Sequence, residues 1–127
     1  MGSWGTAPWD NDTSADWFAA ALAYDTPAWI HAELKAVDEG KSLFSDSTYA
    51  AVWLLSRIGL NYVYNIEYLN EDITRAVELV DRYGETYIER YYTPADRDQV
   101  TAWLASIVRE LTEPKPPGLL GRLAGLQ

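Results

Sequence analysis

The fold is predicted most clearly by residues 93–111, which read TPADRDQVTAWLASIVREL. Thr93 is a residue type that caps helix N-termini, Pro94 suits the first helical position, and Asp96 stands at the capping-box position. Spacings of three and four residues bring one set of apolar side chains to a common face: Val100, Trp103, Leu104, Ile107, Val108 and Leu111. The stretch therefore predicts an amphipathic helix, which Pro114 ends.

The preceding stretch predicts a second long amphipathic helix. Its apolar and tyrosine residues also recur at spacings of three and four: Ile73, Ala76, Val77, Val80, Tyr83, Tyr87, Ile88 and Tyr91. Asn70 is the expected N-cap, and Gly84 is a candidate kink inside the helix. Before it, residues 61–69 show tyrosines at period two but no obvious partner strand, so we expect a connector or a continuation of a helix.

Three shorter helices are predicted upstream. The first begins at Asp12 or Thr13, both residue types that cap helices. The second is capped by Thr26, continues through an apolar stripe and ends at Gly40. The third begins around Asp46 or Ser47 and is apolar nearly all round, which is typical of a central helix. We therefore expect the third helix to be the most buried element.

Together these patterns predict an all-α fold, a small single-domain bundle of four to five helices with the last three at its centre. Residues 1–12 are rich in Gly, Trp and Asp and predict an ordered N-terminal turn segment. The helical domain is assigned to 1–113 and a Pro/Gly/Leu-rich tail to 114–127. The tail carries four leucines on one helical face: Leu119, Leu120, Leu123 and Leu126. Two interpretations of it stay open, a frayed terminus and a segment that folds onto a partner.

Composition limits the classes of function. The chain of 127 residues has no cysteine, which excludes disulfides, zinc–thiolate sites and thiolate nucleophiles. Its net charge is −9, and residues 1–113 hold eight basic and nineteen acidic residues, or −11. Such a body repels nucleic acids and anionic membranes and attracts basic partners, although solubility alone also explains acidity. No secretory leader or membrane span is visible, so a soluble cytoplasmic protein is expected.

No catalytic or metal-binding set is recognisable in the sequence. His31 is the only histidine and has no neighbouring His or Cys, so a structural role is expected. The calcium-loop-like start at Asp10 lacks the glycine and glutamate that such a loop needs, since Ala15 and Ala21 stand there. The other carboxylates lie in patterns typical of solvated helix faces. We therefore expect no enzyme activity, no cofactor and no metal.

The most suggestive feature is a group of tyrosines and acids near residue 90. Three tyrosines share one helix face, and acidic residues lie beside them in sequence, so the group could form an aromatic, acidic surface that binds arginines of a basic partner. The alternative is that the tyrosines belong to the core, with their hydroxyls at its edge. The candidate partner-binding residues are Tyr83, Glu85, Tyr87, Glu89, Tyr91, Tyr92 and Asp96.

The N-terminal residues resemble a known family. Met1-Gly2-Ser3-Trp4-Gly5, followed by Asp10-Asn11-Asp12 and Ala15-Asp16, is similar to the opening of the bacterial family called domain of unknown function 4259. Trp9 stands where many members have Phe. The resemblance covers about the first sixteen residues and implies no established activity. The glycines and tryptophans of the motif themselves indicate a structural role first, as a tight turn anchored on the helices. The resemblance mildly favours a toxin-neutralising, immunity-type function, since such small acidic proteins often accompany toxin genes.

Three hypotheses of function follow. The first is a non-catalytic protein-binding module, in its sharpest form an immunity protein that neutralises a basic toxin or effector. The second is a homo-oligomeric structural module whose tail docks on a neighbour. The third is a carboxylate- or metal-dependent hydrolase.

Overall fold

The computed structural model describes residues 5–23, 25–58 and 66–113. In these ranges the chain forms five helices and no strand. Their bounds are α1 Asp12–Ala23, α2 Thr26–Asp38, α3 Asp46–Ile58, α4 Ile66–Tyr91 and α5 Pro94–Thr112. The prediction of a small all-α bundle is confirmed.

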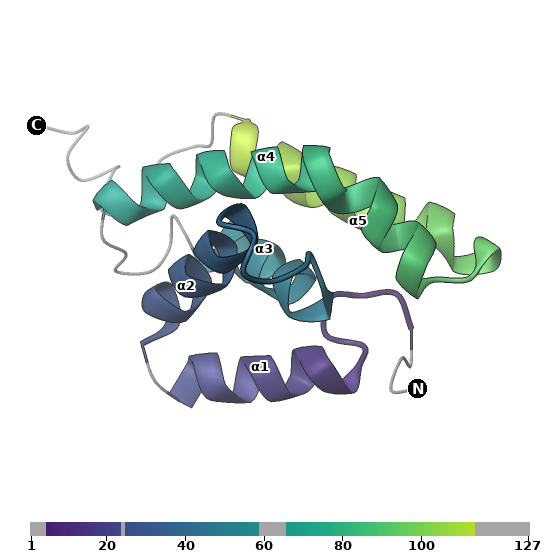
Figure 1. Cartoon of the computed structure of the whole chain (residues 1–127), viewed down its shortest axis with the longest axis horizontal. Coiled ribbons are helices and arrows are strands. Elements are labelled where there is room, and N and C mark those ends of the chain that lie inside the picture. The colour runs from purple at the N-terminus through teal and green to yellow at the C-terminus, as the bar shows by residue number, and fades with distance from the viewer. Residues whose placement is uncertain (1–4, 24, 59–65, 114–127) are drawn as a thin grey trace, which may run out of the picture.

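The helices lie in three layers, with α1 on one side, α2 and α3 in the middle, and α4 beside α5 on the other side (Figure 1). Helix α3 packs mainly against α1, α2 and α5, whereas α4 packs mainly against α2 and α5. The sequence predicts the last three helices at the centre of the bundle, and this prediction is correct for α3 alone. Helices α4 and α5 form an outer layer, so each keeps a face that no described helix covers.

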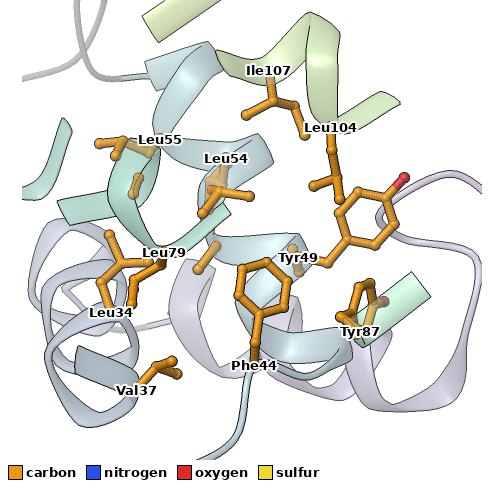
Figure 2. Packing of buried hydrophobic residues seen from close by; sticks show 14 of the residues in the cluster. Leu34, Val37, Phe44, Tyr49, Leu54, Leu55, Leu79, Tyr87, Leu104 and Ile107 are labelled. Carbon is orange, nitrogen blue, oxygen red and sulfur yellow. The ribbon is translucent and has the colours of Figure 1, made fainter. Parts of the chain in front are cut away.

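Helix α3 is the core of the bundle because nearly every side chain on it is apolar or small. Between residues 48 and 56 only Trp53 is half-buried. The buried residues are Thr48, Tyr49, Ala50, Ala51, Val52, Leu54, Leu55 and Ser56. Small alanines let neighbouring helices approach closely, and the leucines fill the space between them. Figure 2 shows leucines of α2, α4 and α5 gathered around the leucines of this helix. The prediction that the third helix is the most buried is confirmed.

The starts of the first two helices follow from local chemistry, but their caps differ from the predicted ones. The caps of α1 and α2 lie one residue earlier than expected: Asn11 Oδ1 accepts from Ser14 N at 2.7 Å, and Asp25 Oδ1 accepts from Ala28 N at 3.3 Å. Thr26 instead donates its hydroxyl to the carbonyl of Ala21 at 3.1 Å and is buried. An Asp or Asn before the helix offers an oxygen that reaches the free N–H groups of the first turn.

Gly40 ends α2 as predicted. It has a φ of 76°, which glycine adopts without strain. Gly40 N donates to Val37 O at 3.1 Å, and Lys41 N donates to Ala36 O at 2.8 Å. These two bonds form a Schellman motif, which satisfies carbonyls that the helix end would otherwise leave open.

Helix α4 begins earlier than predicted. Its first residue is Ile66, so Asn70 lies inside the helix and the prediction of Asn70 as its cap is wrong. The helix-continuation alternative is therefore correct for residues 66–69, while 59–65 lie outside the described residues. At the start of α5, Thr93 is the N-cap residue, but its hydroxyl makes no bond to the backbone. Thr93 Oγ1 instead lies 3.5 Å from Asp96 Oδ2.

Residues 5–10 pack against the bundle through backbone and aromatic contacts. The hydroxyl of Tyr49 donates to Thr6 O at 2.7 Å, inside the core. The Trp9 ring lies edge-on to Trp53 and Trp103, with centroid distances of 4.9 and 5.6 Å. A side chain on Gly5 would meet the Asp10 carboxylate at 2.6 Å, so that carboxylate would have to move from its place beside Ala7 N. Met1-Gly2-Ser3-Trp4 of the family-like motif lies outside the described residues.

Candidate functional site

A groove runs along the outer layer, between α4 and α5, with a volume of about 790 Å³. Its floor is apolar and comes from both helices: Val77, Val80, Gly84, Ile88, Leu104, Ala105 and Val108. A β-carbon on Gly84 would stand 3.5 Å from Val80 and 3.6 Å from Leu104, in ordinary van der Waals contact with both side chains. Some residues of the apolar stripe on α4 therefore pack in the core, and others line the groove.

Acidic side chains border this groove. Glu78, Asp81, Glu85 and Glu89 all line it, all come from α4, and all are exposed. Their spacing of three and four residues places them along one edge of the helix. Neither Glu85 nor Glu89 has an ion-pair partner among the described residues, so both carboxylates can accept a cation from another molecule. We call these four side chains the acidic rim.

Arg97 closes one end of the groove. Its Nε donates to Tyr92 O at 3.1 Å, and its Nη2 donates to Glu89 O at 3.2 Å. Both acceptors are carbonyls at the C-terminal end of α4, where the helix dipole favours a cation. Arg97 therefore ties α5 to the end of α4 and is already engaged within the molecule.

The structure separates the predicted tyrosine and acid group into two parts. Glu85 and Glu89 belong to the acidic rim, and Tyr83 is half-buried. Tyr91 is 45% exposed, and Asp96 is exposed at the start of α5. Two tyrosines, Tyr87 and Tyr92, are buried at 2% and 8% exposure. These two cannot offer their rings to a partner, and for them the core alternative is correct.

Tyr87 lies in an aromatic cluster between α3 and α4. Its ring lies beside those of Phe44 and Tyr49 (Figure 2). The centroid distances are 5.1 Å to Phe44 and 5.8 Å to Tyr49. Its hydroxyl donates to Asp46 Oδ1 at 2.7 Å and lies 3.2 Å from the hydroxyl of Tyr92. Burial raises the pKa of Tyr87 far above its ordinary value, and the charges of Tyr92 and Asp46 raise it further.

A second cluster surrounds His31 between α2 and α4. His31 Nδ1 lies 2.8 Å from Asp72 Oδ1 and 3.8 Å from Glu71 Oε2. The imidazole stacks on Tyr68, with a centroid distance of 4.2 Å and an interplanar angle of 15°. Asp72 is fully buried, so its carboxylate must be paired. Sequence reasoning missed this site because its two central residues lie 41 positions apart.

Arg75 decides the chemistry of the His31 cluster. Its guanidinium contacts Asp72 at 3.5 Å, Glu71 at 3.3 Å and Asp38 at 3.3 Å. His31, Glu71 and Asp72 could each offer one ligand atom to a metal, and these atoms lie within 4.8 Å of one another. However, Arg75 already supplies a positive charge to both carboxylates, and it would repel a metal cation. The arrangement supports a structural network that joins α2 to α4.

We expect Asp72→Ala to lower the free energy of unfolding by about 2–3 kcal/mol, because charged hydrogen bonds to His31 and Arg75 are lost. Glu71→Ala is the matched control, since Glu71 contacts the same two side chains from an exposed position and should cost less than about 1 kcal/mol. Urea unfolding of both variants measures the difference. Equal losses, or a melting temperature that Zn²⁺ raises in the unmodified protein only, would contradict the structural role.

A scan against protein-family models and searches of curated proteins and of solved structures find no match for this chain. The resemblance of residues 1–16 to domain of unknown function 4259 therefore stays a prediction. Within the described ranges, no helix has both the length and the apolar character that crossing a membrane requires.

Proposed function

We propose that this chain is a non-catalytic binding protein that holds a basic, amphipathic helix of another protein in the groove between α4 and α5. The observation that carries the proposal is the combination of an apolar floor with the acidic rim. Helix-in-groove recognition needs this pairing, because apolar anchors at helical spacing fill the floor while charges at the edge set the orientation. An immunity-type role, in which the helix belongs to a basic toxin or effector, is the sharpest form of the proposal.

The charge distribution supports a basic partner. Residues 1–113 have a net charge of −11, and the acidic rim adds a local concentration of negative charge beside the groove. Long-range attraction raises the rate of encounter with a cationic protein, and the effect weakens as salt screens it. Blocking such a partner requires a complementary surface and no chemistry on the part of this chain.

The groove also offers enough apolar surface to anchor a helix. Ile88 and Leu104 of its floor are buried, while Val77, Val80 and Val108 are half-buried and can still lose exposed area. Burial of apolar area contributes roughly 25 cal/mol per Å², so a few leucines inserted here supply most of the binding free energy. The rim charges would then contribute specificity and speed of association more than affinity.

The test uses a synthetic helical peptide with Leu at positions i, i+3, i+4 and i+7 and Lys on the flanks. We expect Glu85→Lys combined with Glu89→Lys to weaken its binding at least about tenfold at low salt, since two attractions become repulsions. Asp16→Lys combined with Asp98→Lys is the matched control, because both residues are exposed, neither lines the groove, and the net charge changes equally. Fluorescence anisotropy of the labelled peptide gives the dissociation constants.

A scrambled peptide of the same composition separates groove binding from general attraction between opposite charges. It keeps the lysines but has no continuous apolar face, so it should bind weakly to every variant. Equal binding of both peptides, or equal losses in the two double variants, would overturn the proposal. The same pair of double variants, used as baits in a native lysate at low and high salt, then identifies the natural partner.

A further inference from the structure

We propose that residues 114–127 of the same chain fold back into the groove between α4 and α5 and compete there with the partner. This inference rests on the proposed function, because it assigns a second occupant to the same site. The groove is apolar with an acidic rim, and the segment that follows α5 has the complementary composition.

The chemistry of the segment fits both parts of the groove. Leu119, Leu120, Leu123 and Leu126 recur at the spacing of one helical face, and such a face fills an apolar floor. Lys115 and Arg122 are its charged residues, and it contains no acid. Its two positive charges would meet Glu78, Asp81, Glu85 and Glu89, which all lie on the α4 side of the groove.

The position of the segment favours its own groove over that of a second copy. Helices α4 and α5 are joined by a short connection and run antiparallel, so Val77 and Val108 mark the groove end nearest the C-terminus of α5. Helix α5 ends at Thr112, about one turn beyond Val108. Residues 114–118 would then be a five-residue connection, which is long enough to join two antiparallel helices.

The lengths also agree. A helix over residues 119–126 would be about 12 Å long, and the groove follows α5 from Arg97 to Val108, or about 16 Å. Because the segment is attached to the same chain, its effective concentration at the groove is in the millimolar range. Weak contacts, such as those of a glycine-containing helix, then suffice to occupy the site. A partner must bind more tightly than the segment to displace it.

The first experiment is cross-linking in the full chain, which contains no native cysteine. Ala105→Cys places a thiol on an exposed position of the groove, and a second cysteine replaces each of residues 119–126 in turn. A disulfide requires the two α-carbons to lie within about 7 Å. Ala19→Cys, on the exposed side of α1, replaces Ala105→Cys in the control series.

We expect an intramolecular disulfide with position 105 to form at least about tenfold faster than with position 19, in a helical pattern along the segment. Monomeric mass on a non-reducing gel identifies the intramolecular product. Disulfide-linked dimers would assign the groove to a second copy. Equally slow disulfide formation with positions 105 and 19 would show that the segment does not occupy the groove. Either result would overturn the proposal.

The second experiment separates this inference from the proposed function. We expect Leu123→Asp combined with Leu126→Asp to strengthen binding of the basic peptide by about tenfold or more, because the competing segment is released. Rapid cross-linking without any peptide binding would keep the inference and overturn the proposed function. If cross-linking is slow and these substitutions leave peptide binding unchanged, the proposed function stands and the inference about residues 114–127 is overturned.

Discussion

Replacing Tyr87 by alanine is expected to lower the free energy of unfolding by about 3–5 kcal/mol, the usual cost of removing a buried aromatic side chain. Tyr87 is 2% exposed and contacts the rings of Phe44 and Tyr49, so its loss leaves a cavity between α3 and α4. The hydroxyl of Tyr92 and the carboxylate of Asp46 also lose a partner at the same place. Urea unfolding at neutral pH measures the effect.

Two controls separate the contributions at this site. Tyr87→Phe keeps the ring and removes the hydroxyl, so it should cost about 1–2 kcal/mol. Tyr91→Ala removes a tyrosine that is 45% exposed and lies 5.3 Å from Tyr87, centroid to centroid, and should cost less than about 1 kcal/mol. A loss for Tyr91→Ala as large as that for Tyr87→Ala would contradict the burial on which this distinction rests.

The second large effect is expected at alkaline pH. Burial raises the pKa of Tyr49 and of Tyr87 well above the ordinary value, and the charge of Tyr92 raises both further. The pKa of Tyr92 is raised as well, chiefly by burial. In the unfolded chain these tyrosines ionise near pH 10, whereas in the folded chain they stay protonated.

The sign of the effect follows from which state releases protons. Above about pH 10 the unfolded chain loses protons that the folded chain keeps, so unfolding becomes more favourable as the pH rises. Below that pH both states are protonated and the contribution of these tyrosines to stability is fully present. Each tyrosine with a raised pKa should lower the free energy of unfolding by about 1.4 kcal/mol per pH unit above 10. For Tyr49 and Tyr87 together the loss is about 3 kcal/mol per unit, and Tyr92 adds to it.

The measurement is urea unfolding between pH 8 and pH 11.5, together with tyrosinate absorbance in the absence of urea. We expect stability to stay level up to about pH 9.5 and then to fall steeply, with part of the tyrosinate signal appearing only as the protein unfolds. Tyr49→Phe and Tyr87→Phe should each reduce the slope by about one third. A free energy of unfolding that does not change between pH 9 and pH 11 would contradict the burial of these hydroxyls.

Local patterns in the sequence were sufficient to predict the helical class and most helix boundaries. Gly40 ends α2 because a glycine takes up the positive φ at which the chain turns, and Pro94 opens α5 because its missing N–H has no partner to lose there. Such preferences involve residues a few positions apart, so a sequence displays them directly. The burial of α3 could be predicted for the same reason, since a helix that is apolar on all sides has no face for water.

Only the tertiary structure decided which side chains of one helix face are core and which are surface. Tyr87 and Tyr91 lie one turn apart and follow the same pattern, yet α3 and Phe44 cover the first and leave the second exposed. The pairing of His31 with Asp72 joins residues 41 positions apart, and no local pattern signals it. The groove likewise exists because α5 covers only part of the apolar stripe on α4. Each outcome depends on how whole helices pack, which periodicity along a single helix does not determine.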